Sequence, residues 1–367
     1  MSSVRNRILL IVVILAAEFA IVEATLRLEG GSEAAPAFQS LFLQDRQVGY
    51  RLKPNASTRY TTVEFSTDIA INGQGVRDDR EIGPKAPDER RIVVLGDSLV
   101  LSVQVPLAET FCKLLEARLN KADPAHRWRV INAGVQGYGP VDEWLFYRRV
   151  VENFEPDLVL VAAFPGNANI ASRNEAWLDN DGPPPGIASA IAQTGIRRLV
   201  RSSMVAQLLR IRKQQFTAHF AGPAPEPPLA TYLASPPPTV QHGLDVTRRA
   251  LGKIAARAAD RGARTAIILM PARFQTDDAD YGRLAETVRE AGGTLVRNAA
   301  TQRGRDALAP LGLPMFDLLP TLEAQPDRMG LYFQQNVHLT TRGHVVVAEA
   351  IFQFLETSGL VNQVANR

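Results

Sequence analysis

The segment Arg91-Ile-Val-Val-Leu-Gly-Asp-Ser-Leu99 joins an apolar run of strand length to a short polar turn. An apolar run that stops at a glycine, as this one does at Gly96, is typical of a strand buried on both faces. In open α/β sheets, ligands and reacting groups collect beyond the carboxyl ends of the strands. Ser98 lies at such an end, so it is the first candidate functional residue. Asp-Ser pairs are also frequent in turns and at helix starts, and the segment alone leaves that interpretation open.

Apolar runs and helical patterns alternate along the rest of the chain. The runs lack the polar alternation of half-exposed strands, which favours a parallel sheet with helices on both faces. The sequence therefore predicts an α/β fold, a three-layer α/β/α sandwich with a flavodoxin-like parallel sheet, over residues 91–360. The expected strands are 91–95, 129–133, 157–163, 265–270 and 314–316, and the expected helices are 109–120, 141–153, 243–261, 278–291 and 342–356.

Two segments do not follow this alternation. Residues 29–90 begin as a polar connector and become rich in Thr, Val, Ile and Tyr from Tyr50 onward, which predicts two or three short strands. Residues 164–242 form an insertion into the α/β domain, and its Pro-rich part, 221–238, predicts an extended surface loop.

Composition excludes some classes of function. The chain has 367 residues, with 41 Lys and Arg against 38 Asp and Glu, and a formal net charge of +3. No dense basic run is present in the sequence, which argues against nucleic acid as a partner. Cys112 is the single cysteine, so an intrachain disulfide framework and a Cys-rich metal site are excluded.

The N-terminus carries a targeting pattern. Arg5 and Arg7 precede an apolar block, residues 8–22, that only Glu18 interrupts. Positive residues ahead of an apolar block hold the N-terminus in the cytoplasm. We expect residues 1–28 to be an uncleaved signal anchor, a transmembrane helix that places the rest of the chain outside the cytoplasm. The block is short for a spanning helix, so a cleaved signal peptide and an ordinary buried helix are the alternatives.

Three further stretches could carry chemistry. The glycines of residues 132–139 allow backbone N–H groups to approach a reacting oxygen, and the side-chain amide of Asn167 is a donor suited to an oxyanion. His338 lies in a loop before the final helix and is the better general base, whereas His344 falls inside that helix and is expected to pack. Each stretch, taken alone, is equally a turn or packing feature.

Taken together and in this order, the four stretches resemble the SGNH (GDSL-type) hydrolase superfamily. Its blocks are a Gly-Asp-Ser nucleophile, an oxyanion glycine, an oxyanion Asn, and a C-terminal Asp-x-His or Asp-x-x-His. The resemblance covers about Arg91 to Leu355. Residues 72–77, Asn-Gly-Gln-Gly-Val-Arg, and the apolar leader are similar to a membrane-anchored bacterial group within it.

The resemblance implies a role for each block. Ser98 matches the nucleophile and also an N–H donor of the oxyanion hole. Gly137 matches the oxyanion glycine, with Gly134 as the other possibility, and Asn167 matches the oxyanion Asn. His338 matches the catalytic base.

The triad acid is where the sequence departs from the family. Gln335 and Asn336 stand at the two positions where the resemblance implies an aspartate. A triad acid orients the imidazole and stabilises its cation, and an amide can supply only the first effect. Three interpretations follow: Asn336 orients His338, a dyad works with a backbone carbonyl, or the site is weak. Ala168 also stands where the family has an aspartate after the oxyanion Asn.

These roles predict a serine hydrolase that acts on acyl esters through an acyl-enzyme, with no metal or organic cofactor implied. The substrate partner is an acyl ester, for example one on an acylated envelope glycan, and the membrane is a partner through the N-terminal helix. The expected location is the bacterial inner membrane, single-pass, with a periplasmic catalytic domain. The alternatives are an envelope polysaccharide O-acyltransferase or deacetylase, and a catalytically weak binding protein.

Overall fold

The computed structural model describes residues 38–45, 47–180 and 229–365. Residues 40–184 and 226–367 belong to one compact unit, which contains every element named below. The expected anchor, residues 1–28, and residues 181–228 of the insertion lie outside the described residues. Among the residues described, no helix has the length and apolar character that crossing a membrane requires.

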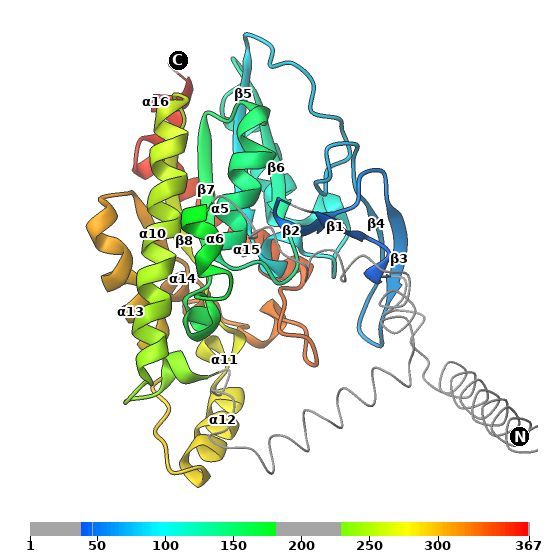
Figure 1. Ribbon diagram of the computed structural model, residues 1–367. Coiled ribbons are helices and arrows are strands. Elements are labelled where there is room, and N and C mark those ends of the chain that lie inside the picture. The colour runs from blue at the N-terminus through cyan, green and yellow to red at the C-terminus, as the bar shows by residue number, and fades with distance from the viewer. Residues whose placement is uncertain (1–37, 46, 181–228, 366–367) are drawn as a thin grey trace, which may run out of the picture. The chain divides into compact units, whose positions relative to one another are not determined.

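A five-stranded parallel sheet forms the centre of this unit (Figure 1). Its order is β6-β5-β7-β8-β9, so the first strand of the sheet lies between the second and the third. This is the flavodoxin-like order, and it confirms the predicted α/β fold with a parallel sheet. The strands are β5 Glu89–Gly96, β6 Arg127–Gly134, β7 Leu158–Ala163, β8 Arg264–Leu269 and β9 Met315–Asp317.

Strand β5 begins two residues earlier than the apolar pattern indicates. Its eight residues are all buried, including the charged side chains of Glu89 and Arg91. Arg91 Nε donates to Glu89 Oε1 at 2.8 Å, and Arg91 Nη1 donates to the Phe154 carbonyl at 2.7 Å. Because these contacts satisfy the charges, a strand extends through residues that hydropathy assigns to a loop.

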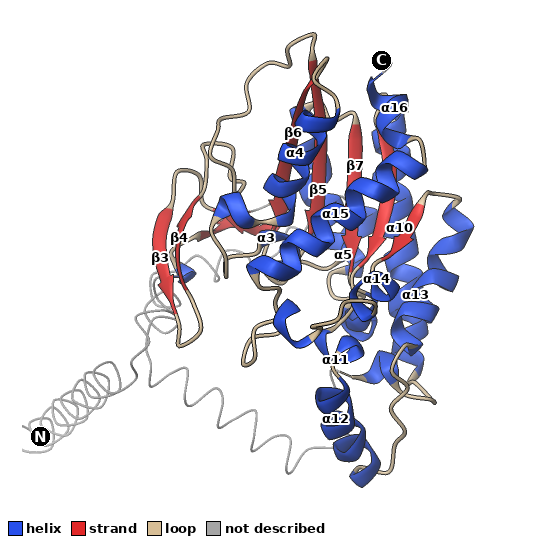
Figure 2. Cartoon of the chain, turned by 180° about the vertical axis from the view of Figure 1, so that it is seen from behind, coloured by secondary structure: helices blue, strands red, loops and turns tan. Residues whose placement is uncertain are grey.

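Helices cover both faces of the sheet (Figures 1 and 2). On one face lie α4 Phe111–Ala122, α15 Thr341–Thr357 and α16 Leu360–Ala365, which share an apolar core with the strands. On the other face lie α5 Pro140–Arg149, α10 Pro238–Asp260 and α13 Ala299–Leu308. The sequence patterns predict all of these except α13 and the short α16. The three layers therefore agree with the predicted sandwich.

Two antiparallel hairpins precede the sheet. They pair β1 with β2 and β3 with β4. Their bounds are β1 Phe42–Asp45, β2 Gly49–Leu52, β3 Ser57–Thr61 and β4 Ser66–Ala70. Three of their strands lie where the pattern predicts two or three, and the fourth, β1, lies in the expected polar connector. Residues 40–82, which contain both hairpins and the turn after them, are called the N-terminal segment below.

The described end of the insertion is buried at residues 230–232, which corrects the expected surface loop there, whereas residues 234–239 are exposed or half-buried. Residues Ala230–Tyr232 form a 3₁₀ turn whose side chains are almost fully buried. Thr231 Oγ1 donates to the Gly166 carbonyl at 3.2 Å, and Leu233 forms a β-bridge with Leu295. Proline content indicates an extended chain here, but these tertiary contacts cover it. Other short elements are α6 Glu175–Asn180, α11 Arg273–Thr276, α12 Asp278–Glu290 and α14 Leu319–Glu323.

Candidate active site

The carboxyl ends of three strands bring three of the predicted site residues to one cavity. Gly96 pairs with Gly134, and Leu95 pairs with Val161, so the turns that follow β5, β6 and β7 are neighbours. A cavity of about 260 Å³ lies there, and its lining includes Ser98, Gly137 and Asn167.

Ser98 begins a one-turn helix, α3 Ser98–Leu101. Asp97 caps this helix, because its Oδ1 accepts the Leu99 N–H at 2.9 Å. Neither the Ser98 hydroxyl nor the Ser98 N–H is hydrogen-bonded to any residue that the structure describes. Both groups are therefore available to a ligand in the cavity.

The carbonyl end of α3 is fully hydrogen-bonded, mostly by distant side chains. Asn132 Nδ2 donates to the Val100 carbonyl at 2.6 Å. The guanidinium of Arg77 donates to the carbonyls of Leu101 and Ser102, and to that of Val105 at 2.7 Å. A four-residue helix leaves most of its carbonyls without an internal partner, so these donors hold α3 in place.

The structure separates the two candidate oxyanion glycines. Gly134 ends β6, its N–H donates to Asn132 Oδ1 at 3.0 Å, and a Cβ there would overlap the backbone of Leu101. Gly134 is therefore a packing glycine. Gly137 lines the cavity, has a positive φ of 73°, and donates its N–H to no acceptor in the described chain. Of the two, Gly137 has the available donor.

Asn167 lies in the 3₁₀ turn Pro165–Ile170, directly after β7. Its backbone N–H donates to the Phe164 carbonyl at 3.3 Å, which fixes the turn. The Asn167 side chain is exposed at the cavity, and its amide bonds to none of the described residues. An amide donor thus lies at the same cavity as the N–H groups of Ser98 and Gly137.

His338 and Asn336 are in contact. Asn336 Oδ1 lies 2.5 Å from His338 Nδ1, and the same oxygen accepts the backbone N–H of His338 at 3.2 Å. Nδ1 therefore carries the ring proton and Nε2 has the free lone pair. Burial lowers the pKa of His338 to about 4, so the ring is neutral at neutral pH.

His338 does not complete a hydrogen-bonded triad in this structure. Its Nε2 is buried and has no hydrogen-bond partner among the described residues, Ser98 included. His338 is also absent from the cavity lining. His344 is a packing residue, as expected: it is buried in α15, and its Nδ1 accepts the Phe111 N–H at 3.2 Å.

Contacts from two directions hold the loop that carries His338. Glu64 Oε1 accepts the N–H groups of Gln334 and Gln335 at 2.7 and 3.0 Å. From the other side, the Arg273 guanidinium donates to the carbonyls of Phe333 and Gln334. Gln335 is exposed, and the structure gives its side chain no bond to His338. The His338 ring is therefore hydrogen-bonded to Asn336, at the Asp-x-His position, and not to Gln335, at the Asp-x-x-His position.

Three residues of the N-terminal segment bind three different parts of the site, and the sequence pattern indicates only one of them. Arg77 binds the end of α3, and Glu64 binds the His338 loop. Tyr50 binds the Gly137 turn, because its hydroxyl donates to the Gln136 carbonyl at 2.7 Å. Only Arg77 stood in a recognisable motif, residues 72–77. We call Tyr50, Glu64 and Arg77 the tether residues.

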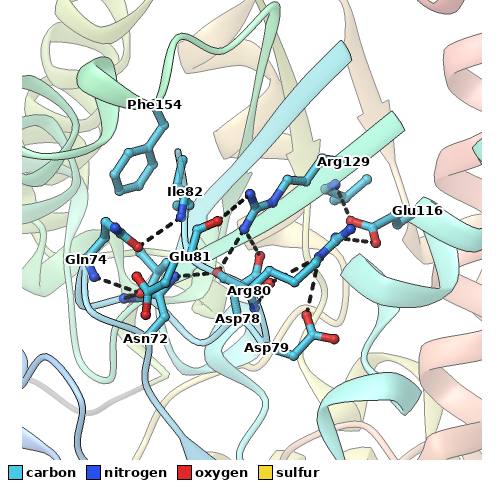
Figure 3. Close-up of polar contacts among 12 residues, drawn as sticks. Asn72, Gln74, Asp78, Asp79, Arg80, Glu81, Ile82, Glu116, Arg129 and Phe154 are labelled. Carbon is cyan, nitrogen blue, oxygen red and sulfur yellow. Dashed lines mark hydrogen bonds and ion pairs between the residues drawn. The ribbon is translucent and has the colours of Figure 1, made fainter. Parts of the chain in front are cut away.

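A polar network gives the turn that carries Arg77 its shape (Figure 3). Asn72 Nδ2 donates to the Arg80 carbonyl at 3.0 Å, and Gln74 Oε1 accepts the Ile82 N–H at 3.0 Å. Arg129 donates to the carbonyls of Arg80 and Glu81 at 2.9 Å each. The network explains why Asn72 and Gln74 stand in the motif: their side chains close the turn and so direct Arg77 inward.

Three carboxyl groups line the cavity beside Ser98: Asp97, Asp142 and Glu143. Burial raises the pKa of Asp97 to about 6 and also raises the pKa of Asp142. Burial, together with the charges of Asp97 and Asp142, raises the pKa of Glu143 well above its usual value. Arg173 is exposed and also lines this cavity.

No protein-family model matches the sequence, and no curated protein sequence matches it. Solved structures do match. A lipase/acylhydrolase from Enterococcus faecalis is 14% identical over 73% of this chain and 96% of its own, with a TM-score of 0.41. A GDSL-like lipase from Bacteroides thetaiotaomicron is 12% identical over 75% and 92%, with a TM-score of 0.36. The acetyl xylan esterase AlAXEase is 13% identical over 72% and 98%, with a TM-score of 0.40.

Proposed function

We propose that this protein is a serine hydrolase that cleaves acyl esters. Ser98 Oγ attacks the acyl carbonyl carbon while its proton passes to His338 Nε2. The N–H groups of Ser98 and Gly137 and the amide of Asn167 stabilise the oxyanion. The leaving alcohol takes the proton from His338, and water then releases the acid from the acyl-enzyme by the same steps.

One observation carries the proposal. The Ser98 hydroxyl is half-buried and has no hydrogen-bond partner among the described residues. It shares a cavity with three hydrogen-bond donors that have no acceptor among those residues either. These donors come from three different strand ends, and a set of unused donors around a nucleophile suits a developing negative charge. The neutral His338 ring, with its free Nε2, supplies the base. The missing hydrogen bond between Ser98 and His338 is compatible with this role, because such bonds often tighten only when substrate binds.

Labelling with a serine-directed fluorophosphonate tests the proposal. We expect one label per chain, its loss in Ser98→Ala, and its retention in Ser57→Ala, which removes an exposed serine from β3. Hydrolysis of p-nitrophenyl acetate should follow the label. An unlabelled wild type that hydrolyses no ester would support the binding-protein alternative. A labelled protein whose product formation rises with added glycan would be an acyltransferase.

We also propose that the catalytic unit is anchored in a bacterial inner membrane and faces the periplasm. This rests on Arg5, Arg7 and the apolar block 8–22.

A further inference from the structure

One carboxyl group in the cavity has no partner within the described chain. Glu143 lies in the first turns of α5, is 6% exposed and lines the same cavity as Ser98. Its carboxyl group makes no hydrogen bond to any residue that the structure describes. Its neighbours differ: Asp142 accepts the Gly139 N–H at 3.0 Å and Asn174 Nδ2 at 2.9 Å, and Asp97 accepts the Leu99 N–H.

A buried polar group without a partner destabilises a fold, so its presence in a cavity calls for an explanation. Burial, together with the charges of Asp97 and Asp142, raises the pKa of Glu143 well above its usual value, which favours the neutral acid. A neutral carboxylic acid has one O–H donor and free acceptor positions, which is the pairing that a hydroxyl group requires. A cation is a poorer match for a neutral carboxyl, and Arg173 already supplies a positive charge at this cavity.

Apolar side chains also line the cavity. Leu244 and Leu251 of α10 and Leu308 of α13 line it. Ligand sites commonly combine apolar walls with a few polar groups that set orientation and specificity. Glu143 is such a polar group.

We infer that Glu143 is a specificity-determining residue that hydrogen-bonds a hydroxyl group of the substrate, so that the site selects uncharged, hydroxyl-bearing esters such as esters of polyols and sugars. This inference rests on the proposed function, since it places the ester carbonyl at Ser98.

The test compares glyceryl monoacetate with propyl acetate, which has the same chain length but no free hydroxyl. We expect wild type to prefer the monoacetate in kcat/KM. Glu143→Leu should reduce that preference about tenfold, the typical effect of losing one net hydrogen bond. Glu143→Gln, which keeps a donor and an acceptor, should retain most of it. Glu290→Gln, at an exposed end of α12, is the control for loss of a carboxylate.

An unchanged preference in Glu143→Leu would overturn the inference, because a merely structural role predicts an equal loss for both esters. Folding is checked by Tm, which should rise in Glu143→Leu as an unpaired buried carboxyl is removed. Binding separates this inference from the proposed function. In the Ser98→Ala protein, calorimetry should show glyceryl monoacetate binding that the added Glu143→Leu weakens. That result supports the inference even if wild type proves inactive, whereas equal binding in both proteins overturns it.

Discussion

Asn336 Oδ1 accepts two hydrogen bonds from His338, one from ring Nδ1 and one from the backbone N–H. The second bond holds the amide with its oxygen toward the ring, so the ring keeps its proton on Nδ1. An amide in the opposite orientation would donate to Nδ1 and place the proton on Nε2, where it blocks the base. A triad Asp-to-Asn change in an unrelated serine protease has this effect, and the wrong tautomer lowers turnover there by about 10⁴.

Asn336→Asp should therefore add charge without changing the orientation of the ring. A carboxylate beside Nδ1 stabilises the imidazolium, so the pKa of His338 rises from about 4. Turnover at neutral pH should increase, and the acidic limb of the pH profile should move to higher pH. Gln335→Asp is the matched control, because Gln335 is exposed and does not contact the ring. A slower Asn336→Asp enzyme would mean that the amide is adapted to this site.

The acidic side of the kcat/KM profile should show two limbs. Burial lowers the pKa of His338 to about 4, and protonation below that value removes the base. Burial raises the pKa of Asp97 to about 6, and Asp97 lies next to Ser98. Asp97→Asn should remove the upper limb and leave the lower one, since an amide still caps α3. Stopped assays across the acidic and neutral range measure both limbs. A single limb near the ordinary histidine value of about 6.5, present in both proteins, would exclude this assignment.

Asn167→Ala should lower kcat about 10²–10³-fold and change KM little, because the proposed role of the amide is to stabilise charge that develops in the transition state. Asn167→Asp keeps the shape, removes the donor and adds repulsion to the oxyanion, so its kcat should be lower still. Steady-state kinetics on p-nitrophenyl acetate separates kcat from KM. Raised KM with unchanged kcat would show that Asn167 only holds the substrate.

Arg77→Lys should lower kcat more than it changes KM. A lysine keeps the charge but cannot reach the carbonyls of Leu101, Ser102 and Val105 together. A displacement of about 1 Å at Ser98 is enough for a loss of about 10² in kcat. Arg59→Met, which removes an exposed arginine from β3, should leave kcat unchanged.

Methylguanidine added to Arg77→Ala tests whether Arg77 positions Ser98. It should restore part of kcat in the folded protein, and Tm is measured alongside. A lower Tm with normal kcat in the folded fraction, and no rescue, would make Arg77 a stabilising residue only.

An alkaline phosphatase reporter fused after Pro36 should be active if, as proposed, Arg5 and Arg7 hold the N-terminus in the cytoplasm. Replacing both arginines by glutamate should reduce the activity. Either an inactive reporter or a mature N-terminus near residue 25 would contradict an uncleaved anchor.

Local pattern was sufficient for the order of the five strands of the sheet and for four of the helices that cover it, but not for α13 and α16. The strands of the sheet are short apolar runs, and the turns after them carry Ser98, Gly137 and Asn167. Because parallel strands align their carboxyl ends at one edge, sequence position alone predicts that these three residues are neighbours. The predicted start of β5 was two residues too late. Glu89 and Arg91 are charged, and a hydropathy pattern assigns charged residues to a loop even when they are buried and paired with each other.

Tertiary structure decided which of the alternative residues are available for chemistry. Gly134 and Gly137 are alike in sequence, but the structure shows that the Gly134 N–H donates to Asn132 Oδ1 and that α3 packs against this glycine. Glu64 and Gln334 are 270 positions apart, and their contact exists only once the hairpin and the His338 loop have folded together. The free carboxyl of Glu143 is likewise invisible in sequence, because whether a polar group has a partner depends on the three-dimensional arrangement of the chain around it.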